Sequence, residues 1–583
     1  MARWIVVAAL TLAFAMMVGV RPGGGLYSPD VRYRLQTGAM LRGTLALQPV
    51  PHGQRADWAW GNGSQQVWGI GVPLLRMPGE LVARVLGWPA FPDRITLVAF
   101  FALVMIVAVR SVPGTVTTSR SIVAGLVAAT IGLMPAFVAL SRTRLFVYEE
   151  AVVYGYLWAA LQVALVVGVA GGAPRSWSFA AAAVAGAGAL IRPTLFLYGV
   201  VTIAIVVGVQ LRGRVRRTTT VTTIASFLSG IALTLWTNAL RFGYPLEFGQ
   251  RVNVSRWIPD QFAKNFDYPF AHEPLFSASR ELIAALVGIG IRFNGVDFYG
   301  SGAAMHAWFS STIRFREFYA SSGATWIFMA LAIGGWMLVA VRLARQRARA
   351  LDDPAGAVLL WSLLTFSSMA IFYVRMPTMT TRYAVDFAAA VAAAVIGIVM
   401  TVAAKRPARL VPLAVVLGAS WLYGLATVSV SPTHAAQPLV GWAQLAQTMP
   451  APVTTGPALP SRYACGDRID ELGVPFNGIG WNWAADCGLA AGSTLFFSMP
   501  PEAQCLELDL ANADAGKEAS IEIALGSVRL DRVAPNVFCA PAGYRRNPAG
   551  VEIASFKWIP AAELSVSRRP GFGLRAVRAI QRP

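Results

Sequence analysis

The sequence predicts an α-helical membrane protein that crosses the bilayer about eleven times and ends in a small β domain. Of its 583 residues, 56% are apolar and only 13% are charged, and the mean hydropathy is +0.54. A soluble domain carries roughly 25% charged residues, so an ordinary soluble enzyme is excluded. The net charge of +20 would suggest nucleic acid in a soluble protein. In a multi-span protein, basic residues set the orientation instead.

Each predicted span is a stretch of predominantly apolar residues, of which a bilayer core needs about 20 per helix. The eleven stretches are 4–20, 94–110, 121–140, 151–170, 177–191, 194–211, 221–240, 323–341, 355–373, 384–404 and 410–428. The first is interpreted as a retained anchor and not as a signal peptide. No clear small-x-small cleavage site follows it, and ten more spans do.

Basic residues mark every second connection between these spans. If the N-terminus is inside, the inner side receives fifteen basic residues and only two acids, Asp352 and Asp353. The fifteen are Arg3, Arg110, Arg120, Arg175, Arg212, Arg214, Arg216, Arg217, Arg342, Arg345, Arg347, Arg349, Lys405, Arg406 and Arg409. The positive-inside rule therefore predicts a cytoplasmic N-terminus and an extracytoplasmic C-terminus in the bacterial cytoplasmic membrane.

This topology divides the chain into a membrane domain, a linker and a tail. The membrane domain, residues 1–428, has outer loops at about 21–93 and 241–322. Residues 429–460 are rich in Pro, Ala and Thr and are interpreted as a linker. Residues 461–583 contain short alternating runs separated by Gly, Pro and Asn, which predict an extracytoplasmic β-sandwich.

All four cysteines, Cys465, Cys487, Cys505 and Cys539, lie in the tail. An even set confined to one soluble domain indicates two disulfides in an oxidising compartment, with their connectivity open. A zinc site is the alternative, but no CxxC spacing supports it and the four His are scattered.

Asp30 is the first candidate for chemistry, because it follows the first span closely. Pro29 precedes it, which places Asp30 in the first turn of a helix over 31–45. The apolar residues of that stretch have helical spacing, typical of a helix that lies along the membrane interface. The helix dipole favours a carboxylate in this position. The alternative is that Asp30 only caps the helix.

Aromatic and amide residues gather later in the first outer loop. Aromatic rings stack on the apolar faces of sugars and amides bond sugar hydroxyls, so these residues are candidate substrate contacts. The set is Asp57, Trp58, Trp60, Gln66 and Trp68. An interfacial tryptophan belt is the alternative interpretation.

Charged residues stand at the outer ends of several spans. Glu149 and Glu150 precede the fourth span, where carboxylates near the membrane indicate a functional role. Ion pairs with Arg142 and Arg144 are the alternative. Arg192 lies between the fifth and sixth spans with almost no loop, so it must face protein, phosphate or water.

The tenth span begins with Arg382, Tyr383 and Asp386. Arg382 and Asp386 are four residues apart and therefore share a helix face. Arg382 could bind an anion with Asp386 orienting it, or the two could form a self-contained ion pair. The second outer loop adds Arg241 and Glu247, in a run rich in Gly, Pro and aromatic residues that indicates an ordered turn.

In the predicted topology these residues all lie at the outer face, near span ends. An acid and several Arg at headgroup depth, with aromatic loops above them, suit a lipid-linked phosphate substrate. Arg is the residue that matches phosphate geometry best.

On these residues the sequence resembles the polytopic GT-C glycosyltransferases, over spans one to ten and most of residues 1–404. The matching pieces are Ser28-Pro29-Asp30 followed by Arg32-Tyr33-Arg34-Leu35, the run Gln66-Val67-Trp68-Gly69-Ile70-Gly71-Val72-Pro73, Glu149-Glu150, Arg192-Pro193, the run Arg241-Phe242-Gly243-Tyr244-Pro245-Leu246-Glu247-Phe248-Gly249, and Arg382-Tyr383-Ala384-Val385-Asp386-Phe387. The tail is similar to β domains appended to some arabinofuranosyl and mannosyl transferases. Many members carry two adjacent acids in the first loop, whereas Asp30 is alone, which puts metal-assisted variants of the mechanism in doubt.

The resemblance implies a GT-C-like fold and an inverting transfer of a hexose or pentose from a polyprenyl-phosphate donor. The acceptor would be a cell-envelope glycan, lipid or protein. Asp30 would act as general base, and Arg382, Arg192 and Arg144 would bind the donor phosphate. Membrane lipids are expected partners and nucleic acid is not. No cofactor is predicted; no dedicated metal-ligand set is visible, and a divalent metal is left open.

Three other functions are consistent with parts of the sequence. A secondary transporter would place polar residues at mid-membrane and show internal repeats, but the spans are nearly free of central charges and no repeat is found. A polysaccharide polymerase or ligase without a catalytic carboxylate is a second alternative. A non-catalytic scaffold whose tail binds glycan is the third.

Overall fold

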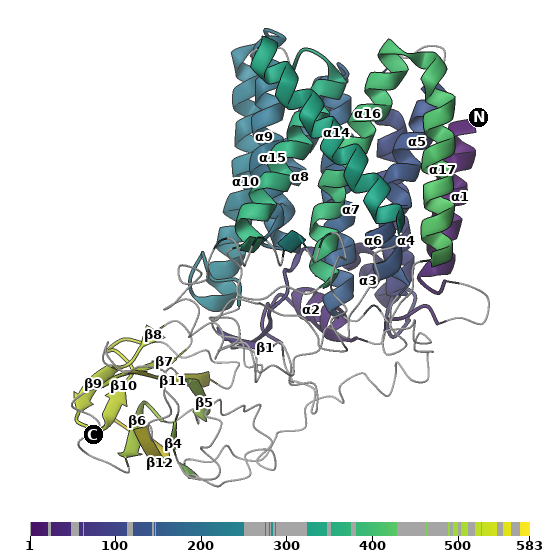
Figure 1. Cartoon of the computed structure of the whole chain (residues 1–583). Helices are drawn as coiled ribbons and strands as arrows, with labels where there is room; N and C mark the ends of the chain where they lie inside the picture. The colour runs from purple at the N-terminus through teal and green to yellow at the C-terminus, as the bar shows by residue number, and fades with distance from the viewer. Residues whose placement is uncertain are drawn as a thin grey trace, which may run out of the picture. The chain divides into compact units, whose positions relative to one another are not determined.

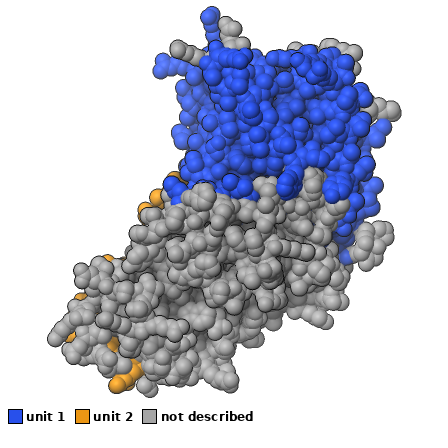
Figure 2. Space-filling view, viewed as in Figure 1, with its two compact units in different colours: residues 1–34, 69–234, 270–448 blue, residues 35–68, 235–269, 449–583 orange. Residues whose placement is uncertain are grey.

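The computed structural model of the chain divides into two compact units, which Figure 2 colours separately. Unit 1 comprises residues 1–34, 69–234 and 270–448, and unit 2 comprises residues 35–68, 235–269 and 449–583. The structure describes residues 2–20, 25–28, 30–47, 58–61, 63–113, 120–142, 145, 147–249, 323–346, 351–374, 381–427, 462–464, 488–489, 494–499, 503–510, 519–525, 528–544, 552–560 and 572–582, with a few isolated positions between 275 and 286.

A helix lies at each of the eleven predicted spans, and the helices form a bundle (Figure 1). They are α1 (Ala2–Met17), α4 (Asp93–Ser111), the pair α5 (Arg120–Gly132) and α6 (Pro135–Ser141), α7 (Val147–Ala170), α8 (Arg175–Ile191), α9 (Leu195–Arg212), α10 (Arg217–Phe242), α14 (Gly323–Gln346), α15 (Pro354–Val374), α16 (Val385–Lys405) and α17 (Leu410–Thr427). Among the described residues, eight helices are long and apolar enough to cross a membrane, or nine if α5 and α6 count as one span. The chain is therefore a membrane protein, and the count of eleven spans stays a prediction.

The helices α1, α5, α6 and α8 differ from a straight span of about 20 residues, either because they are bent or because they are short. α5 and α6 are bent by 52° at the break before Pro135. Proline lacks the N–H that would continue the helix, so it begins a new one. α1 and α8 have only 16 and 17 residues.

Helices α7 and α16 are central in the bundle. Across their most apolar stretches, 94% of α7 and 78% of α16 is buried, against 28% for α10 and 22% for α14. α7 packs against α4, α8, α9, α15 and α16. The ends of α7 are therefore held in place by the helices packed around it.

The bundle has two chemically different ends. We call the end where α1 finishes and α4, α7 and α16 begin the Asp30 end, and the opposite end the arginine end. At the arginine end, Arg212 pairs with Asp352 at 2.9 Å and Arg342 with Asp353 at 3.3 Å. The two acids among the fifteen basic residues are thus matched to arginines of neighbouring helices.

Two short helices follow α1, and they differ from the predicted interfacial helix over 31–45. α2 spans only Arg32–Met40 and is mostly buried, so Asp30 precedes it and does not lie in its first turn. The exposed apolar residues belong instead to α3 (Gly71–Val85), whose opposite face buries Arg76. The prediction was wrong because the charged side chains of α2 find buried ion-pair partners that helical spacing cannot reveal.

Unit 2 contains the strands, all in antiparallel pairs among the residues described. β1 (Trp58–Gly61) pairs with β2 (Gly63–Gln66). The tail forms a six-stranded sheet, ordered β3-β12-β6-β10-β9 with β4 beside β12, and a four-stranded sheet, ordered β5-β11-β7-β8. Their bounds are β3 (Arg462–Ala464), β4 (Gly488–Leu489), β5 (Thr494–Met499), β6 (Cys505–Leu510), β7 (Ala519–Leu525), β8 (Val528–Arg529), β9 (Asp531–Ala534), β10 (Val537–Cys539), β11 (Glu552–Pro560) and β12 (Phe572–Ile580). Packing of the sheets as a sandwich stays a prediction.

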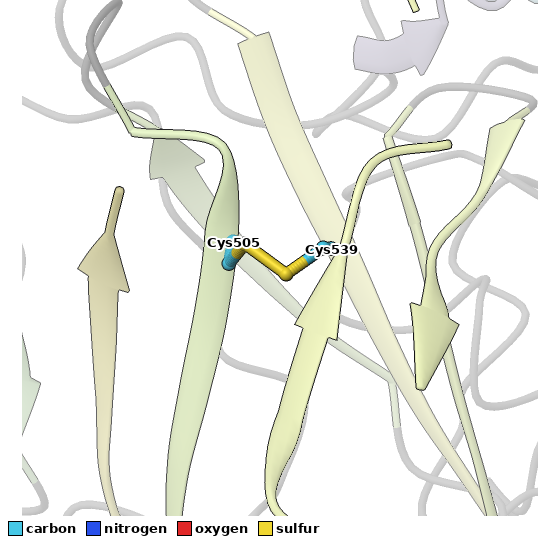
Figure 3. The surroundings of a disulfide bond; sticks show 2 residues. All are labelled: Cys505 and Cys539. Atoms are coloured by element: carbon cyan, nitrogen blue, oxygen red, sulfur yellow. A yellow bond between two sulfur atoms is a disulfide. The ribbon is translucent and has the colours of Figure 1, made fainter. Parts of the chain in front are cut away.

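One of the predicted disulfides joins Cys505 to Cys539 (Figure 3). The two residues are directly opposite each other on β6 and β10, and both are fully buried. The bond therefore fixes the register of these two strands. Cys465 and Cys487 lie outside the described residues.

Candidate functional site

The Asp30 carboxylate lies between two helix N-termini at the Asp30 end of unit 1. Its Oδ1 accepts a hydrogen bond from the backbone N–H of Arg32 at 2.9 Å, and its Oδ2 accepts one from that of Val147 at 3.3 Å. Arg32 and Val147 are the first residues of α2 and α7. The Arg32 guanidinium lies 3.3 Å from Oδ2. Helix N-termini are favourable sites for anions, so the local backbone holds a carboxylate here.

Beside Asp30, five buried side chains form an alternating chain of ion pairs. Arg34 bonds Asp93 at 2.8 Å, and Arg76 lies 3.5 Å from the same carboxylate. Arg76 reaches Glu150 at 2.9 Å, and Arg94 reaches the other oxygen of Glu150 at 3.0 Å. All five side chains are at most 5% exposed. We call Arg34, Asp93, Arg76, Glu150 and Arg94 the ion-pair chain.

The ion-pair chain ties the segments that carry Asp30 to the ends of the spans. The backbone N–H of Ser28 donates to Asp93 at 2.7 Å, and Arg34 donates to the Ser28 carbonyl at 3.0 Å. The Leu145 carbonyl accepts from the Ser28 hydroxyl and from Arg94. Leu145 has φ of +49°, which is rare for a residue with a bulky side chain. Its strained backbone orients this carbonyl, two residues before the N–H that holds Asp30.

Tyr33 and Arg76 have protonation states fixed by these surroundings. Burial, followed by the Glu150 charge, raises the pKa of Tyr33 well above its ordinary value. Burial alone would lower the pKa of Arg76, but the Glu150 and Asp93 carboxylates outweigh it and raise that pKa. The Arg76 guanidinium lies 5.3 Å from the centre of the Tyr33 ring. Tyr33 is therefore a neutral phenol and Arg76 a cation across the physiological pH range.

Arg192 and Asp386 form a second buried pair in unit 1. Arg192 Nη2 lies 2.7 Å from Asp386 Oδ2, although the residues are 194 positions apart in the chain. The Tyr373 hydroxyl donates to the same carboxylate, and the Tyr198 hydroxyl donates to the Asp386 backbone carbonyl. The Tyr383 ring lies 5.8 Å from the Arg192 guanidinium. The predicted residues Arg192, Asp386 and Tyr383 thus lie together.

No protein-family model matches this chain, and no curated protein matches it. It is similar to two solved structures at low TM-scores. One is the archaeal oligosaccharyltransferase AglB from Archaeoglobus fulgidus in complex with an inhibitory peptide and a dolichol-phosphate: 13% identity, 75% of this chain and 56% of that chain covered, TM-score 0.35. The other is the arabinosyltransferase EmbB from Mycobacterium smegmatis: 12% identity, 99% and 64% covered, TM-score 0.29. The chain therefore spans between half and two thirds of the length of these structures.

In unit 2, Arg241 holds the end of the first outer loop. It donates to the backbone carbonyls of Gln66 and Trp68, the latter at 3.1 Å, and to the Gln65 side chain at 3.4 Å. The Gln66 side chain accepts from the Trp68 backbone N–H at 2.9 Å. Arg241, Gln66 and Trp68 therefore lie together, in a turn that their own hydrogen bonds stabilise.

The other predicted residues fall into three groups. Glu149 is fully buried on the first turn of α7, and Glu247 is half-buried after α10. Backbones alone are described for Trp58, Trp60 and Arg382. Asp57 and Arg144 lie outside the described residues. Glu150, predicted with Arg142 or Arg144 as its alternative partner, pairs with Arg76 and Arg94, while Arg142 donates to the Leu425 carbonyl.

The sequence reasoning missed Arg76, Asp93 and Arg94. A signal for the last two was present, since adjacent opposite charges begin the second span. Arg76 gave none, because a single Arg in an amphipathic stretch is typical of a solvated face. Among the described residues, no group of three or more His, Cys, Asp or Glu side chains is placed to hold a metal ion.

Proposed function

We propose that this chain is an inverting glycosyltransferase that moves a sugar from a polyprenyl-phosphate donor to a cell-envelope glycan, lipid or protein acceptor. The reaction takes place at the outer face of the cytoplasmic membrane. The observation that carries the proposal is the Asp30 carboxylate, 9% exposed, at the edge of a buried, arginine-rich cluster where membrane-crossing helices end.

Asp30 acts as the general base in this proposal. A carboxylate offers about four lone-pair positions, and the backbone N–H groups of Arg32 and Val147 use two of them. A remaining lone pair accepts the proton of the acceptor hydroxyl. The acceptor oxygen then attacks the anomeric carbon, and the bond from that carbon to the donor phosphate breaks with its electron pair on the phosphate. Attack opposite the leaving group inverts the anomeric configuration.

Arginines neutralise the phosphate as it leaves. Arg382, Arg192 and Arg144 are the proposed phosphate ligands. Asp386 bonds only one terminal nitrogen of Arg192, and a guanidinium has five N–H donors. Arg192 Nε is buried without a hydrogen-bond partner among the described residues. Asp386 therefore orients Arg192 while donors are left for an anion.

The remaining predicted side chains surround the sugar and the acceptor in this proposal. Glu149, Tyr383, Asp57, Trp58 and Trp60 are proposed substrate contacts. Gln66, Trp68, Arg241 and Glu247 are proposed as further substrate contacts. The positive-inside pattern supports a cytoplasmic N-terminus and an extracytoplasmic tail.

Asp30→Asn tests the role of the carboxylate. Asn keeps a side-chain oxygen that can cap the helix but is not a base, and general-base action contributes about 10²–10⁴-fold to a rate. With polyprenyl-phosphate mannose and polyprenyl-phosphate arabinose as donors, we expect transfer to fall by at least about 10²-fold with donor binding near normal. Asp531→Asn, on an exposed strand of the tail, is the matched control. Full activity of Asp30→Asn would remove Asp30 from the mechanism.

A further inference from the structure

Helix α3 presents a narrow apolar stripe on the surface of unit 1. Leu74, Pro78, Leu81, Val82 and Val85 are all exposed, with Val85 at 87%. At 3.6 residues per turn these five positions fall within roughly a third of the helix circumference. The stripe continues into Leu86 and Trp88, at 53% and 43% exposed. Contiguous exposed apolar surface of this kind marks an interaction site.

The start and the middle of α3 are fixed to the ends of the spans. Gly69 and Gly71 lie so close to the backbone of Leu190 and Ile191, at the end of α8, that a Cβ would clash there. A Cβ at Gly79 would also clash, with the Phe91 ring just before α4. α3 is therefore held at the level where α8 finishes and α4 begins, where two of the predicted spans end.

The composition of α3 fits a helix in the plane of the membrane. It has 15 residues and three charged side chains, Arg76, Glu80 and Arg84, whereas a span needs about 20 predominantly apolar residues. Amphipathic helices that lie in the interface bury one apolar face at the edge of the hydrocarbon. Trp88 follows the helix, and Trp is enriched at this depth.

We propose that the α3 stripe is a membrane-contact surface whose partner is the acyl chains of the bilayer leaflet at the Asp30 end. A second copy of the chain is a poorer fit, because a stable dimer buries about 800 Å² per partner and five partly exposed aliphatic side chains supply less. Arg76 points away from the stripe, to Asp93 and Glu150. Lipid contact on one face of α3 therefore supports the ion-pair chain on the other.

A nitroxide spin label tests the lipid contact. The label is placed at Val85→Cys in the full-length protein in lipid nanodiscs, and at Val533→Cys, an exposed valine of the tail, as matched control. The parent protein, which has no introduced cysteine, is treated with the same label and gives the background signal from the native cysteines. The measured quantity is the ratio of the label's collision rate with oxygen to its collision rate with a water-soluble nickel chelate. We expect this ratio to be severalfold higher at position 85 than at position 533.

Two results would overturn this contact. Equal accessibility to the nickel chelate at both positions would place the stripe in water. Low accessibility to both reagents, with spin–spin broadening that vanishes on dilution with unlabelled protein, would place a second copy there. Leu81→Cys repeats the measurement if Val85→Cys does not fold.

Hydrogen exchange tests the support of Arg76. In Val85→Asp, a charge on the stripe should lift α3 from the lipid, and the backbone amides at the start of α7, beside Glu150, should exchange severalfold faster. Val533→Asp should leave them unchanged. Unchanged exchange in Val85→Asp, with a spin label at Leu81→Cys in the same variant showing displacement, would overturn the coupling while leaving the lipid contact intact. Neither readout uses catalysis, so both are independent of the proposed function.

Discussion

Asp30 and Glu150 are both carboxylates near helix N-termini, but their surroundings separate their roles. Asp30 is held by two backbone N–H groups and one arginine and keeps 9% exposure. Glu150 is 1% exposed and lies between two arginines. A buried carboxylate with both oxygens engaged by cations is a structural element, whereas a carboxylate with an exposed edge can meet a substrate.

Glu150→Gln should therefore destabilise the protein before it alters any chemistry. Removing one partner of a buried ion pair leaves an uncompensated charge, at a cost of about 3–5 kcal/mol. Thermal denaturation in detergent should show a large loss of stability. Glu507→Gln is the control, because Glu507 lies 3.8 Å from Arg578 on the surface, where ion pairs contribute about 0–1 kcal/mol. Equal melting of the two variants would contradict the structural role of Glu150.

At the residue scale, the sequence singled out several polar side chains that the structure places in buried ion pairs, but it did not predict their partners. Asp30, Glu150, Arg192 and Asp386 were found because charges near apolar spans are costly. Their partners could not be found in the same way. Arg192 and Asp386 are separated by 194 positions, and helical periodicity carries no information on contacts between distant elements. Arg382 was predicted as the neighbour of Asp386 because the two are four residues apart, and this helical spacing was the only contact that the sequence could indicate.

At the scale of elements, apolar runs of the right length predicted every helix position in the bundle. The reason is physical: backbone groups in a bilayer must be satisfied within the segment, so an apolar run of this length becomes a helix. The ion-pair chain and the burial of α2 depend on tertiary contacts. Apolar spacing therefore could not show that α3, and not the stretch 31–45, carries the exposed apolar face. The small residues of α8 have a direct explanation in the structure, which is close packing against α10.

Close packing of α8 against α10 requires glycine on both helices. A Cβ at Gly230 would lie 2.5 Å from the carbonyl carbon of Gly186, and small residues permit such approaches between membrane helices. Gly230→Ala should therefore lower the melting temperature of the protein in detergent. Gly334→Ala in α14 meets no atom within 4 Å and should stabilise slightly, by up to about 1 kcal/mol from helix propensity. Similar melting of both variants would contradict the close α8–α10 contact.

At the scale of the whole molecule, the bundle separates its charges by end. Buried acids and arginines pair at the Asp30 end, while exposed arginines such as Arg214, Arg216 and Arg217 gather at the arginine end. This separation supports one orientation in the membrane. It also explains the net charge of +20 without a nucleic-acid partner.

Cysteine labelling in intact cells checks the orientation. Thr44→Cys, exposed after α2, should react with a membrane-impermeant maleimide if the proposed orientation is right. Thr218→Cys, exposed at the arginine end, should react only after the cells are permeabilised. The opposite pattern would reverse the topology and place Asp30 in the cytoplasm.

The most direct test of the central claim is the fate of the donor sugar. Wild-type protein in proteoliposomes would receive polyprenyl-phosphate mannose or polyprenyl-phosphate arabinose, labelled at the anomeric carbon, with extracted cell-envelope glycans as acceptor. The account predicts release of polyprenyl phosphate in equal amount to a glycosylated product, whose anomeric configuration by NMR is opposite to that of the donor. A product with retained configuration, or transport of a soluble solute without any glycosyl transfer, would contradict it.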